Sequence, residues 1–321
     1  MSRSSFAAAV ATGCFALSAV ATVQAAFPDR PVRLIVPYAA GGITDQVGRQ
    51  LAELMSAQLG QPVVVENKPG ANGTMGATLI KNAAADGYTL TMAPVGVFRQ
   101  PYMQKTPFDP IADFTYVARV AGYSSAIGVP AGSAYKNLQD LIDAAKKPGA
   151  NLSYGTSGTY STHHLAMVML GAETGAQWTH IPFKGDSEAI TSMLGNNTEV
   201  TVVANTMRPF VDDSRIRILA TFGDSRSADY PEAPTAQEQG YKVVMASPFG
   251  IIAPTGVPQD VVAKLDAAVA AAMQQPKFKA FADQVGLNLM YQDSAAYTAY
   301  AKGAFAQEKV ILETAGVPSE R

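Results

Sequence analysis

The sequence Leu-Ile-Val-Pro-Tyr-Ala-Ala-Gly-Gly-Ile-Thr-Asp, residues 34–45, joins an apolar strand, a glycine turn and a potential helix start. Small residues in such a turn let a ligand approach the backbone, and the first amides of the following helix have no partner within that helix. The positive end of the helix dipole adds to their attraction for an anion. We therefore predict that this loop binds an anion and that Thr44 or Asp45 caps the helix.

The N-terminal residues predict export. Arg3 is the only charge in the first 28 residues, and residues 6–20 are largely apolar. Small residues precede an expected cleavage site after Ala25 or Ala26, so residues 1–25 have the pattern of a cleavable signal peptide. A buried N-terminal helix or a membrane anchor is the alternative interpretation.

Composition narrows the chemistry of the mature chain. Its one cysteine, Cys14, lies in the expected signal peptide, which leaves neither a disulfide nor a thiolate site. The formal net charge of −2 includes Arg3, so cleavage gives −2 − 1 = −3. No basic stripe indicates binding to nucleic acid or to a membrane surface. Removing 25 or 26 of the 321 residues leaves about 295, a length that favours two domains.

Apolar runs alternate with helical patterns along the chain, which favours an α/β fold with parallel sheets covered by helices. The first unit is expected to contain strands 32–37, 63–65 and 89–93 and helices 44–59 and 72–84. The second unit, which begins near Gly122, is expected to contain strands 126–129, 152–154, 179–182, 199–203 and 217–221 and helices 137–145 and 161–174.

The C-terminal region has helical spacing and little expected strand, so it should pack back on the first unit. Pro258 occupies a first-turn position of its first expected helix. Residues 26–122 and 249–321 would then form a discontinuous first lobe, and residues 123–248 the second lobe. Two crossings of the chain between the lobes predict a hinge.

A second glycine-rich loop follows the expected strand 152–154. Residues 155–164, Gly-Thr-Ser-Gly-Thr-Tyr-Ser-Thr-His-His, place hydroxyls and glycines at the start of the next helix. Such neutral donors bind a carboxylate without the cost of burying a cation. Either loop alone is also explained as a capped turn between a strand and a helix. Because both loops follow strands of parallel sheets, together they favour a ligand cleft between the lobes.

Catalytic and metal-binding patterns are weak. Ser157 lacks the glycine spacing of a nucleophile elbow, and the adjacent His163 and His164 point about 100° apart on a helix, so they cannot share a metal ion. Residues 70–76 have the wrong glycine spacing for a dinucleotide fingerprint. Lys184 is a candidate anion ligand or a solvated loop residue. We predict no catalytic residue, no metal and no cofactor, with a hydrolase using Ser157 and His163 as a remote alternative.

Six segments, in order along the chain, carry a family resemblance. They are residues 27–45, which include the opening loop, Val-Glu-Asn-Lys-Pro-Gly-Ala-Asn-Gly at 65–73, Asp-Gly-Tyr-Thr-Leu at 86–90, Tyr-Gly-Thr-Ser-Gly at 154–158, His-Ile-Pro-Phe-Lys-Gly at 180–185 and Gly-Ile-Ile-Ala-Pro at 250–254. This series resembles the substrate-binding proteins of tripartite tricarboxylate transporters, the Bug family. The resemblance spans nearly the whole mature chain.

The resemblance implies a type II-like, two-lobed periplasmic binding protein fold that closes on a small organic carboxylate, each lobe a mostly parallel sheet flanked by helices. It implies a periplasmic, monomeric protein that catalyses nothing and delivers its ligand to membrane permease subunits. A sensor that passes the bound carboxylate to a signalling receptor is the alternative. By position, the resemblance assigns ligand contacts to Tyr38, Ala40, Gly41, Gly42, Thr44 and Asp45 in the first loop, and to Ser157, Gly158, Thr159, Tyr160, Ser161, Thr162, His163, Lys184, Gly185 and Asp186 in or behind the second.

One segment departs from the family pattern. Residues 93–98, Ala-Pro-Val-Gly-Val-Phe, are apolar where relatives commonly show small polar residues, and the second loop contains Tyr160. The carboxylate could be a dicarboxylate, a tricarboxylate or an aromatic carboxylate, and we hypothesise a ligand with a substantial apolar part, such as an aromatic carboxylate, in preference to a highly charged tricarboxylate. The alternative is that residues 93–98 only pack beneath the hinge. The predicted site also includes Val95 and Val97 from this segment, together with Asn205 and Phe249.

Overall fold

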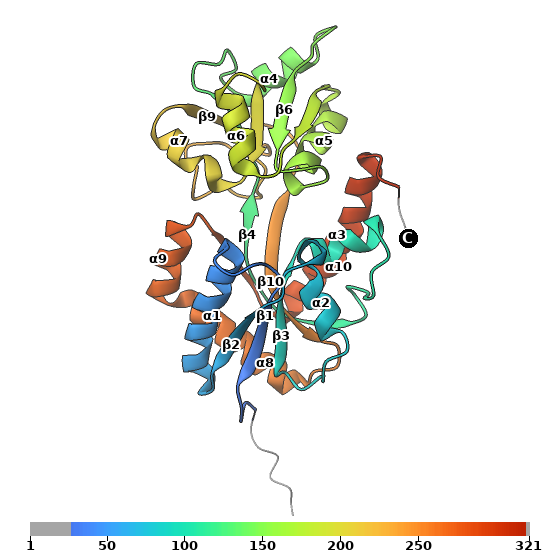
Figure 1. The fold of residues 1–321 in the computed structure, drawn as a ribbon, viewed down its shortest axis with the longest axis vertical. Helices are drawn as coiled ribbons and strands as arrows, with labels where there is room; N and C mark the ends of the chain where they lie inside the picture. The colour runs from blue at the N-terminus through green and yellow to red at the C-terminus, as the bar shows by residue number, and fades with distance from the viewer. Residues whose placement is uncertain (1–26, 319–321) are drawn as a thin grey trace, which may run out of the picture.

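The computed structural model describes residues 27–318, so the expected signal peptide lies outside the described residues. Residues 27–318 form two lobes, each with a β-sheet and helices packed against it (Figure 1). No helix among them is long and apolar enough to cross a membrane. The structure thus has the expected two-lobed α/β fold.

The first lobe, the lower one in Figure 1, is built on a sheet with the strand order β11-β4-β10-β3-β1-β2. Its strands are β1 (Val32–Val36), β2 (Val63–Asn67), β3 (Thr89–Pro94), β4 (Phe114–Ser124), β10 (Ala246–Pro254) and β11 (Asn288–Gln292). Its helices are η1 (Ala71–Gly73), α1 (Ile43–Leu59), α2 (Met75–Ile80), α3 (Gly96–Met103), α8 (Gln259–Gln274), α9 (Pro276–Gln284) and α10 (Ser294–Thr314).

Helices cover both faces of this first sheet, and the apolar run of β1 shows why. Val32, Leu34 and Val36 pack in one hydrophobic cluster with residues of α1 and α8. Ile35 points the other way, into a cluster with residues of α2 and α10. Because both faces are covered, the strand is apolar at almost every position instead of alternating.

The second lobe is built on a sheet with the strand order β7-β6-β8-β5-β9. Its strands are β5 (Ala126–Pro130), β6 (Ser153–Thr156), β7 (Thr179–Pro182), β8 (Val200–Val203) and β9 (Ile216–Thr221). Its helices are α4 (Leu138–Ala145), α5 (Thr162–Thr174), α6 (Asp186–Leu194), η2 (Asn205–Met207) and α7 (Arg208–Asp212).

Two long antiparallel strands, β4 and β10, connect the lobes (Figure 1). Their pairing extends from Phe114 opposite Pro254 to Ser124 opposite Ala246, and only Ser125 separates β4 from β5. The boundaries proposed from the sequence, at residues 122–123 and 248–249, therefore fall inside two strands that are hydrogen-bonded to each other. The hinge at this place stays a prediction.

The expectation of mostly parallel sheets was wrong, because both sheets are mixed. In the first sheet β1 is parallel to β2 and β3, but β10 pairs antiparallel with β3 and β4, and β11 pairs antiparallel with β4. In the second sheet β6 is parallel to β7 and β8, whereas β5 is antiparallel to β8 and β9. The antiparallel pairs that β10 makes arise because the chain leaves that lobe along β4 and returns along β10.

Two further expectations, the extent of one helix and the strand content of the C-terminal region, were also wrong. The helix expected at 72–84 spans only Met75–Ile80, because Asn72 and Gly73 have φ values of 50° and 85°, which no α-helix accommodates. The C-terminal region contributes two strands, β10 and β11, where little strand was expected. The strand β4 and the helix α3 were missed as well.

The C-terminal helix α10 contacts both lobes. It packs on β4 and α3 of the first lobe and also reaches α5 of the second. Ile311 and Leu312, near its end, belong to the same hydrophobic cluster as Leu165 and Leu170 of α5. The C-terminal region therefore does more than cover the first sheet: it forms a further connection between the lobes.

Candidate ligand-binding cleft

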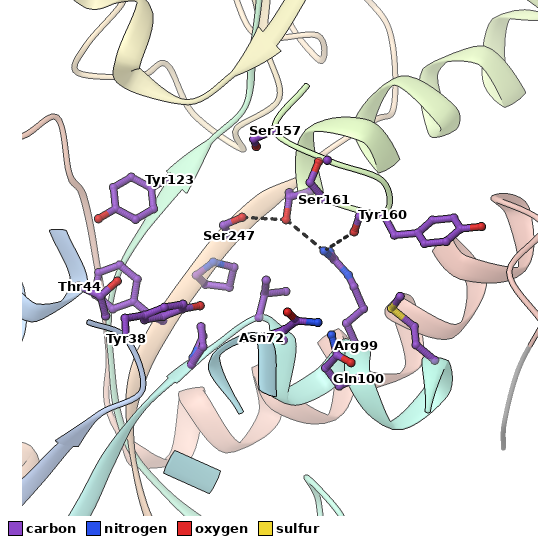
Figure 2. Close-up of a pocket in the computed structure, with 18 of the residues that line it drawn as sticks. Tyr38, Thr44, Asn72, Arg99, Gln100, Tyr123, Ser157, Tyr160, Ser161 and Ser247 are labelled. Carbon is purple, nitrogen blue, oxygen red and sulfur yellow. Dashed lines mark hydrogen bonds between the residues drawn. The ribbon is translucent and has the colours of Figure 1, made fainter. Parts of the chain in front are cut away.

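A cavity of about 380 Å³ lies between the lobes and is lined by residues of both (Figure 2). Ten predicted site residues line it: Tyr38, Thr44, Val95, Ser157, Gly158, Thr159, Tyr160, Ser161, Thr162 and Phe249. Residues outside the predicted set complete the lining: Asn72, Pro94, Gly96, Arg99, Gln100, Met103, Tyr123, Ser247 and Pro248. The structure thus brings residues of the two glycine-rich loops to one cavity.

Asp45 holds the first loop in place. Its Oδ2 accepts hydrogen bonds from the Gly41 amide at 2.8 Å and from Arg49 Nε at 3.0 Å. Its Oδ1 accepts a hydrogen bond from Asn67 Nδ2 at 2.8 Å, which ties the loop to the end of β2. Asn67 Nδ2 also lies 3.1 Å from the carbonyl oxygen of Tyr38. One buried carboxylate therefore fixes the loop between β1 and α1 through contacts to three separate segments.

The first amides of α1 have no side-chain cap. The helix begins at Ile43, and its N-cap residue Gly42 has an extended backbone and no side chain to accept a hydrogen bond. The expected cap by Thr44 or Asp45 was therefore wrong, since both residues lie inside the helix. Uncapped amides at a helix N-terminus are available to an anion, and Thr44 lines the cavity beside them.

The carboxylate of Asp45 has a lowered pKa. Burial raises this pKa, because only 2% of the residue is exposed, but the hydrogen bonds from Arg49, the Gly41 amide and Asn67 outweigh burial. Since the pKa is lower in the folded state, Asp45 stabilises the fold above the unfolded pKa of about 4 and loses this contribution only as the pH falls below that value.

The second loop is held by the first residues of α5. Ser161 is the N-cap of this helix, and its hydroxyl accepts a hydrogen bond from the His164 amide at 3.2 Å. His164 Nδ1 accepts a hydrogen bond from the Tyr160 amide at 2.9 Å, so this nitrogen carries no proton. Tyr160 has a φ of 58°, a left-handed conformation that is uncommon for a tyrosine. His164 thus stabilises an unfavourable backbone conformation inside the loop.

Two stacked imidazoles support this loop. The rings of His164 and His180 lie with centroids 3.9 Å apart and planes at 14°. Burial lowers the pKa of His164, and burial together with the neighbouring His164 lowers the pKa of His180 to about 4. His180 Nε2 lies 2.8 Å from the hydroxyl of Thr156, which also contacts Gly158. Both rings are neutral at pH 7, where they position the second loop.

Aromatic side chains form one flank of the cavity. Tyr38, Tyr123 and Phe249 line it, and the ring centroids of Tyr123 and Phe249 lie 5.8 Å apart. Val95 lines the cavity as well, whereas Val97 is fully buried in the core of the first lobe. Both interpretations of the segment 93–98 therefore hold in part, because Val95 faces the cavity and Val97 packs in the core.

The other ten predicted residues do not line the cavity: Ala40, Gly41, Gly42, Asp45, Val97, His163, Lys184, Gly185, Asp186 and Asn205. Several of them have other partners in this structure. His163 Nδ1 lies 2.7 Å from Ser125 Oγ, and Asp186 accepts a hydrogen bond from the hydroxyl of Thr206 at 2.9 Å. Lys184 donates its amide hydrogen to a glutamate of α6.

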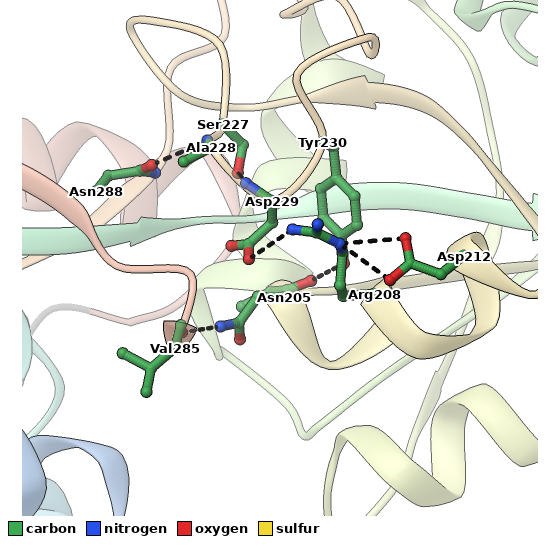
Figure 3. Close-up of polar contacts among 10 residues, drawn as sticks. Asn205, Arg208, Asp212, Ser227, Ala228, Asp229, Tyr230, Val285 and Asn288 are labelled. Atoms are coloured by element: carbon green, nitrogen blue, oxygen red, sulfur yellow. Dashed lines mark hydrogen bonds and ion pairs between the residues drawn. The ribbon is translucent and has the colours of Figure 1, made fainter. Parts of the chain in front are cut away.

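Asn205 takes part in a second contact between the lobes (Figure 3). Its Nδ2 donates a hydrogen bond to the carbonyl oxygen of Val285 at 2.5 Å. Nearby, the amide of Ala228 donates to Asn288 Oδ1 at 3.4 Å. Val285 and Asn288 belong to the first lobe, at the connection from α9 to β11, so these polar contacts join the lobes outside the cavity.

Arg99 is a charged residue among the cavity-lining residues that the sequence analysis did not predict. It lies on α3, and only 6% of it is exposed. Its Nε and Nη2 donate to the two carboxylate oxygens of Glu308 on α10, at 2.7 and 2.9 Å. Its Nη1 points to the second lobe, where it lies 3.3 Å from Thr162 Oγ1 and 3.4 Å from the carbonyl oxygen of Tyr160. No local pattern marks Arg99, because its partner is 209 positions away.

The fold and the cavity together define a class of protein: a two-lobed solute-binding protein with a ligand-sized cavity between its lobes. A family model described as "Tripartite tricarboxylate transporter family receptor", TctC, matches residues 47–317. The chain belongs to this family. Between residues 27 and 318, no three His, Cys, Asp or Glu side chains gather as metal ligands would.

Relatives agree with this assignment over most of the chain. A Cupriavidus necator protein named "UPF0065 protein in gbd 5'region" is 40% identical over 311 residues, which cover 96% of this chain and 95% of that protein. BugT of Bordetella pertussis is 31% identical over 265 residues, which cover 80% of this chain and 81% of BugT. The family consists of solute-binding receptors, so the protein is a receptor and not an enzyme. The hydrolase alternative was wrong: His163 contacts Ser125 instead of Ser157.

Solved structures show the same fold. A TctC solute-binding protein from Polaromonas superposes with a TM-score of 0.83 at 29% identity, covering 89% of this chain and 99% of that one. A Rhodopseudomonas palustris protein with adipate has a TM-score of 0.74 at 27% identity, covering 91% and 99%. MatC from the same organism, with bound malate, has a TM-score of 0.70 at 26% identity, covering 89% and 100%.

Proposed function

We propose that this protein captures a small organic carboxylate in the periplasm and delivers it to the membrane subunits of a tripartite tricarboxylate transporter. One observation carries the proposal: the uncapped start of α1 in one lobe and the hydroxyl-rich loop of the other lobe lie at a single cavity. The carboxylates named for two structural neighbours, adipate and malate, support a ligand of this class. The signal-peptide pattern of residues 1–25 supports export.

The ligand carboxylate binds at the first loop. Amides at the start of α1 and the hydroxyl of Thr44 donate hydrogen bonds to it, and the helix dipole adds to the attraction. The hydroxyls of Ser157, Thr159 and Ser161 lie on the other side of the cavity, on the second lobe. A ligand that contacts both lobes favours their closed arrangement, which a membrane partner distinguishes from the open one.

The ligand has an apolar or aromatic part. Tyr38, Tyr123 and Phe249 offer ring surfaces in the cavity, and such surfaces gain free energy when they cover apolar groups of a ligand. A compact tricarboxylate such as citrate has no group that matches this flank. We therefore infer an aromatic or otherwise apolar carboxylate in preference to a highly charged one.

Calorimetric titration of the purified mature protein tests both parts of the proposal. We expect benzoate-type acids to bind and citrate to bind at least about tenfold more weakly, a difference of about 1.4 kcal/mol. The variant Thr44→Val should weaken carboxylate binding, whereas Thr314→Val, at the exposed end of α10, should not. Tight citrate binding without response to aromatic acids would contradict the apolar ligand, and no carboxylate binding at all would contradict the function.

A further inference from the structure

Arg99 and Glu308 form a buried ion pair at one side of the cavity. Arg99 is the one charged residue that lines the cavity in the described part of the chain. Two parallel hydrogen bonds join its Nε and Nη2 to both carboxylate oxygens of Glu308, which is 5% exposed. Paired geometry of this kind orients both groups firmly. The positive charge of Arg99 is therefore already balanced by a negative charge of this chain.

The Nη1 group of Arg99 is held much less firmly than the other two nitrogens. Its distances of 3.3 Å to Thr162 Oγ1 and 3.4 Å to the Tyr160 carbonyl oxygen are long for a charge-assisted hydrogen bond, which is usually about 2.7–2.9 Å. Thr162 Oγ1 also accepts a hydrogen bond from Ser247 Oγ at 2.9 Å, so it does not depend on Arg99. A ligand oxygen can therefore replace these weak contacts at Nη1.

The far end of a bound ligand meets this group. Figure 2 shows Arg99 on the other side of the cavity from Tyr38 and Thr44, with the amide side chains of Asn72 and Gln100 near it. A ligand whose carboxylate binds at the first loop therefore extends toward Arg99. Amide side chains both donate and accept hydrogen bonds, which suits a hydroxyl or carbonyl group of the ligand.

We propose that the Arg99–Glu308 pair selects ligands by charge at this far end. Arg99 Nη1 donates a hydrogen bond to a neutral oxygen of the ligand, and the carboxylate of Glu308 repels a second ligand carboxylate from the same guanidinium. The preferred ligand is then a monocarboxylate with a hydroxyl, carbonyl or ester oxygen at its far end. This inference rests on the proposed capture of carboxylates in the cleft.

Matched pairs of acids test the inference in calorimetric titrations at pH 7.5. Each pair has the same skeleton and differs at the far end: 4-hydroxybenzoate with terephthalate, and the ω-hydroxy acids of three to six carbons with the corresponding dicarboxylates. We expect the wild type to bind the hydroxy acid of the best-binding pair at least about tenfold more tightly. The variant Glu308→Gln leaves Arg99 charged and keeps the size of the side chain, so it should remove or reverse this ratio.

A second variant guards against loss of folding. Glu308→Gln leaves a buried guanidinium without its partner and could therefore destabilise the fold. The double variant Arg99→Gln, Glu308→Gln buries no charge and should be measured beside it. It should bind both acids of a pair within about threefold of each other. A dicarboxylate that binds the wild type as tightly as its hydroxy partner, or a ratio unchanged in both variants, overturns charge selection but leaves carboxylate capture standing. Absence of binding across the whole series overturns both.

Discussion

The two loops of the cleft look alike in sequence but are held by different chemistry. The first loop is fixed by a carboxylate, Asp45, which accepts hydrogen bonds from an amide, a guanidinium and a carboxamide. The second is fixed by a neutral imidazole, His164, which accepts a single amide hydrogen and stacks on His180. The carboxylate that holds the first loop therefore stays charged down to a pH below about 4, whereas the second loop depends on an imidazole whose pKa burial lowers from about 6.5.

This difference gives the two loops different rigidity. The first loop draws three segments of one lobe to a single buried charge, so it offers a rigid surface to the proposed ligand carboxylate. The second loop includes an unfavourable backbone conformation at Tyr160 and faces the ligand from the other lobe. Its hold is weaker and sensitive to pH, so we expect mutations in the two loops to differ in size and in pH dependence.

The largest effect is expected for Asp45→Ala. The change leaves the Gly41 amide and Asn67 without their acceptor and should lower the free energy of unfolding by about 2 kcal/mol. Carboxylate affinity should fall by about 100-fold, because the first loop no longer holds its geometry. Urea unfolding and calorimetric titration measure the two changes.

Asp45→Asn is the matched control, because it keeps one oxygen acceptor in the same place and should lose less on both measures. An Asp45→Ala variant that binds within threefold of the wild type would show that the first loop does not need this carboxylate.

The next largest effect is a pH dependence of ligand binding that His164 causes. An imidazolium has no acceptor for the Tyr160 amide, so affinity should fall by about tenfold once the pH drops through the pKa of His164, which burial holds below 6.5. His164→Gln keeps an acceptor that does not gain a proton in this range, and its affinity profile should be flatter. Titrations of both proteins at several pH values with one aromatic acid make the comparison.

The same histidines predict loss of stability in acid. Burial lowers the pKa of His164 and His180, the latter to about 4, so the unfolded chain takes up protons first. Stability is full above the unfolded pKa of about 6.5 and falls as the pH drops from there toward 4. Melting curves across this range should show a steeper decline for the wild type than for His164→Gln. Parallel declines would contradict the role given to His164.

A smaller effect is expected from Gly41→Ala. Gly41 has a φ of 85°, and an added methyl group meets no atom within 4 Å, so the cost is one of backbone conformation alone. We expect a loss of about 1 kcal/mol in unfolding free energy. Gly42→Ala is the control, because Gly42 has a φ of −69° and should tolerate alanine. Equal losses in the two variants would show that the turn does not need the left-handed residue.

The smallest effect is expected outside the loops, at the contact in Figure 3. Asn205→Ala removes one hydrogen bond between the lobes, to the Val285 carbonyl oxygen, without touching the cavity. Stability should fall by about 1 kcal/mol or less, and ligand affinity should stay within about threefold. A tenfold change in affinity would place the control of closure at this contact instead of in the loops.

The strand–turn–helix pattern of residues 34–45 was readable from the sequence because its signals are local. Apolar runs, glycine turns and helical spacing depend on neighbours a few positions away, and so the short strands and both loops were predicted close to their observed places. The long strands β4 and β10 were missed because Arg119 and the glycines within them interrupt the apolar pattern, and their pairing joins segments more than 120 positions apart. Pairing between distant strands leaves little trace in either strand alone.

The sequence by itself determined the class of the protein and the two loops that meet at the cavity. The tertiary structure alone decided how each loop is held, the first by Asp45 and the second by His164, and that Arg99, paired with Glu308, faces the cavity. The physical reason is that hydrogen bonds form between groups that are close in space, whatever their separation along the sequence. Residue types and spacing show which hydrogen-bonding groups a segment contains, but only the folded chain shows which of these groups already have a partner.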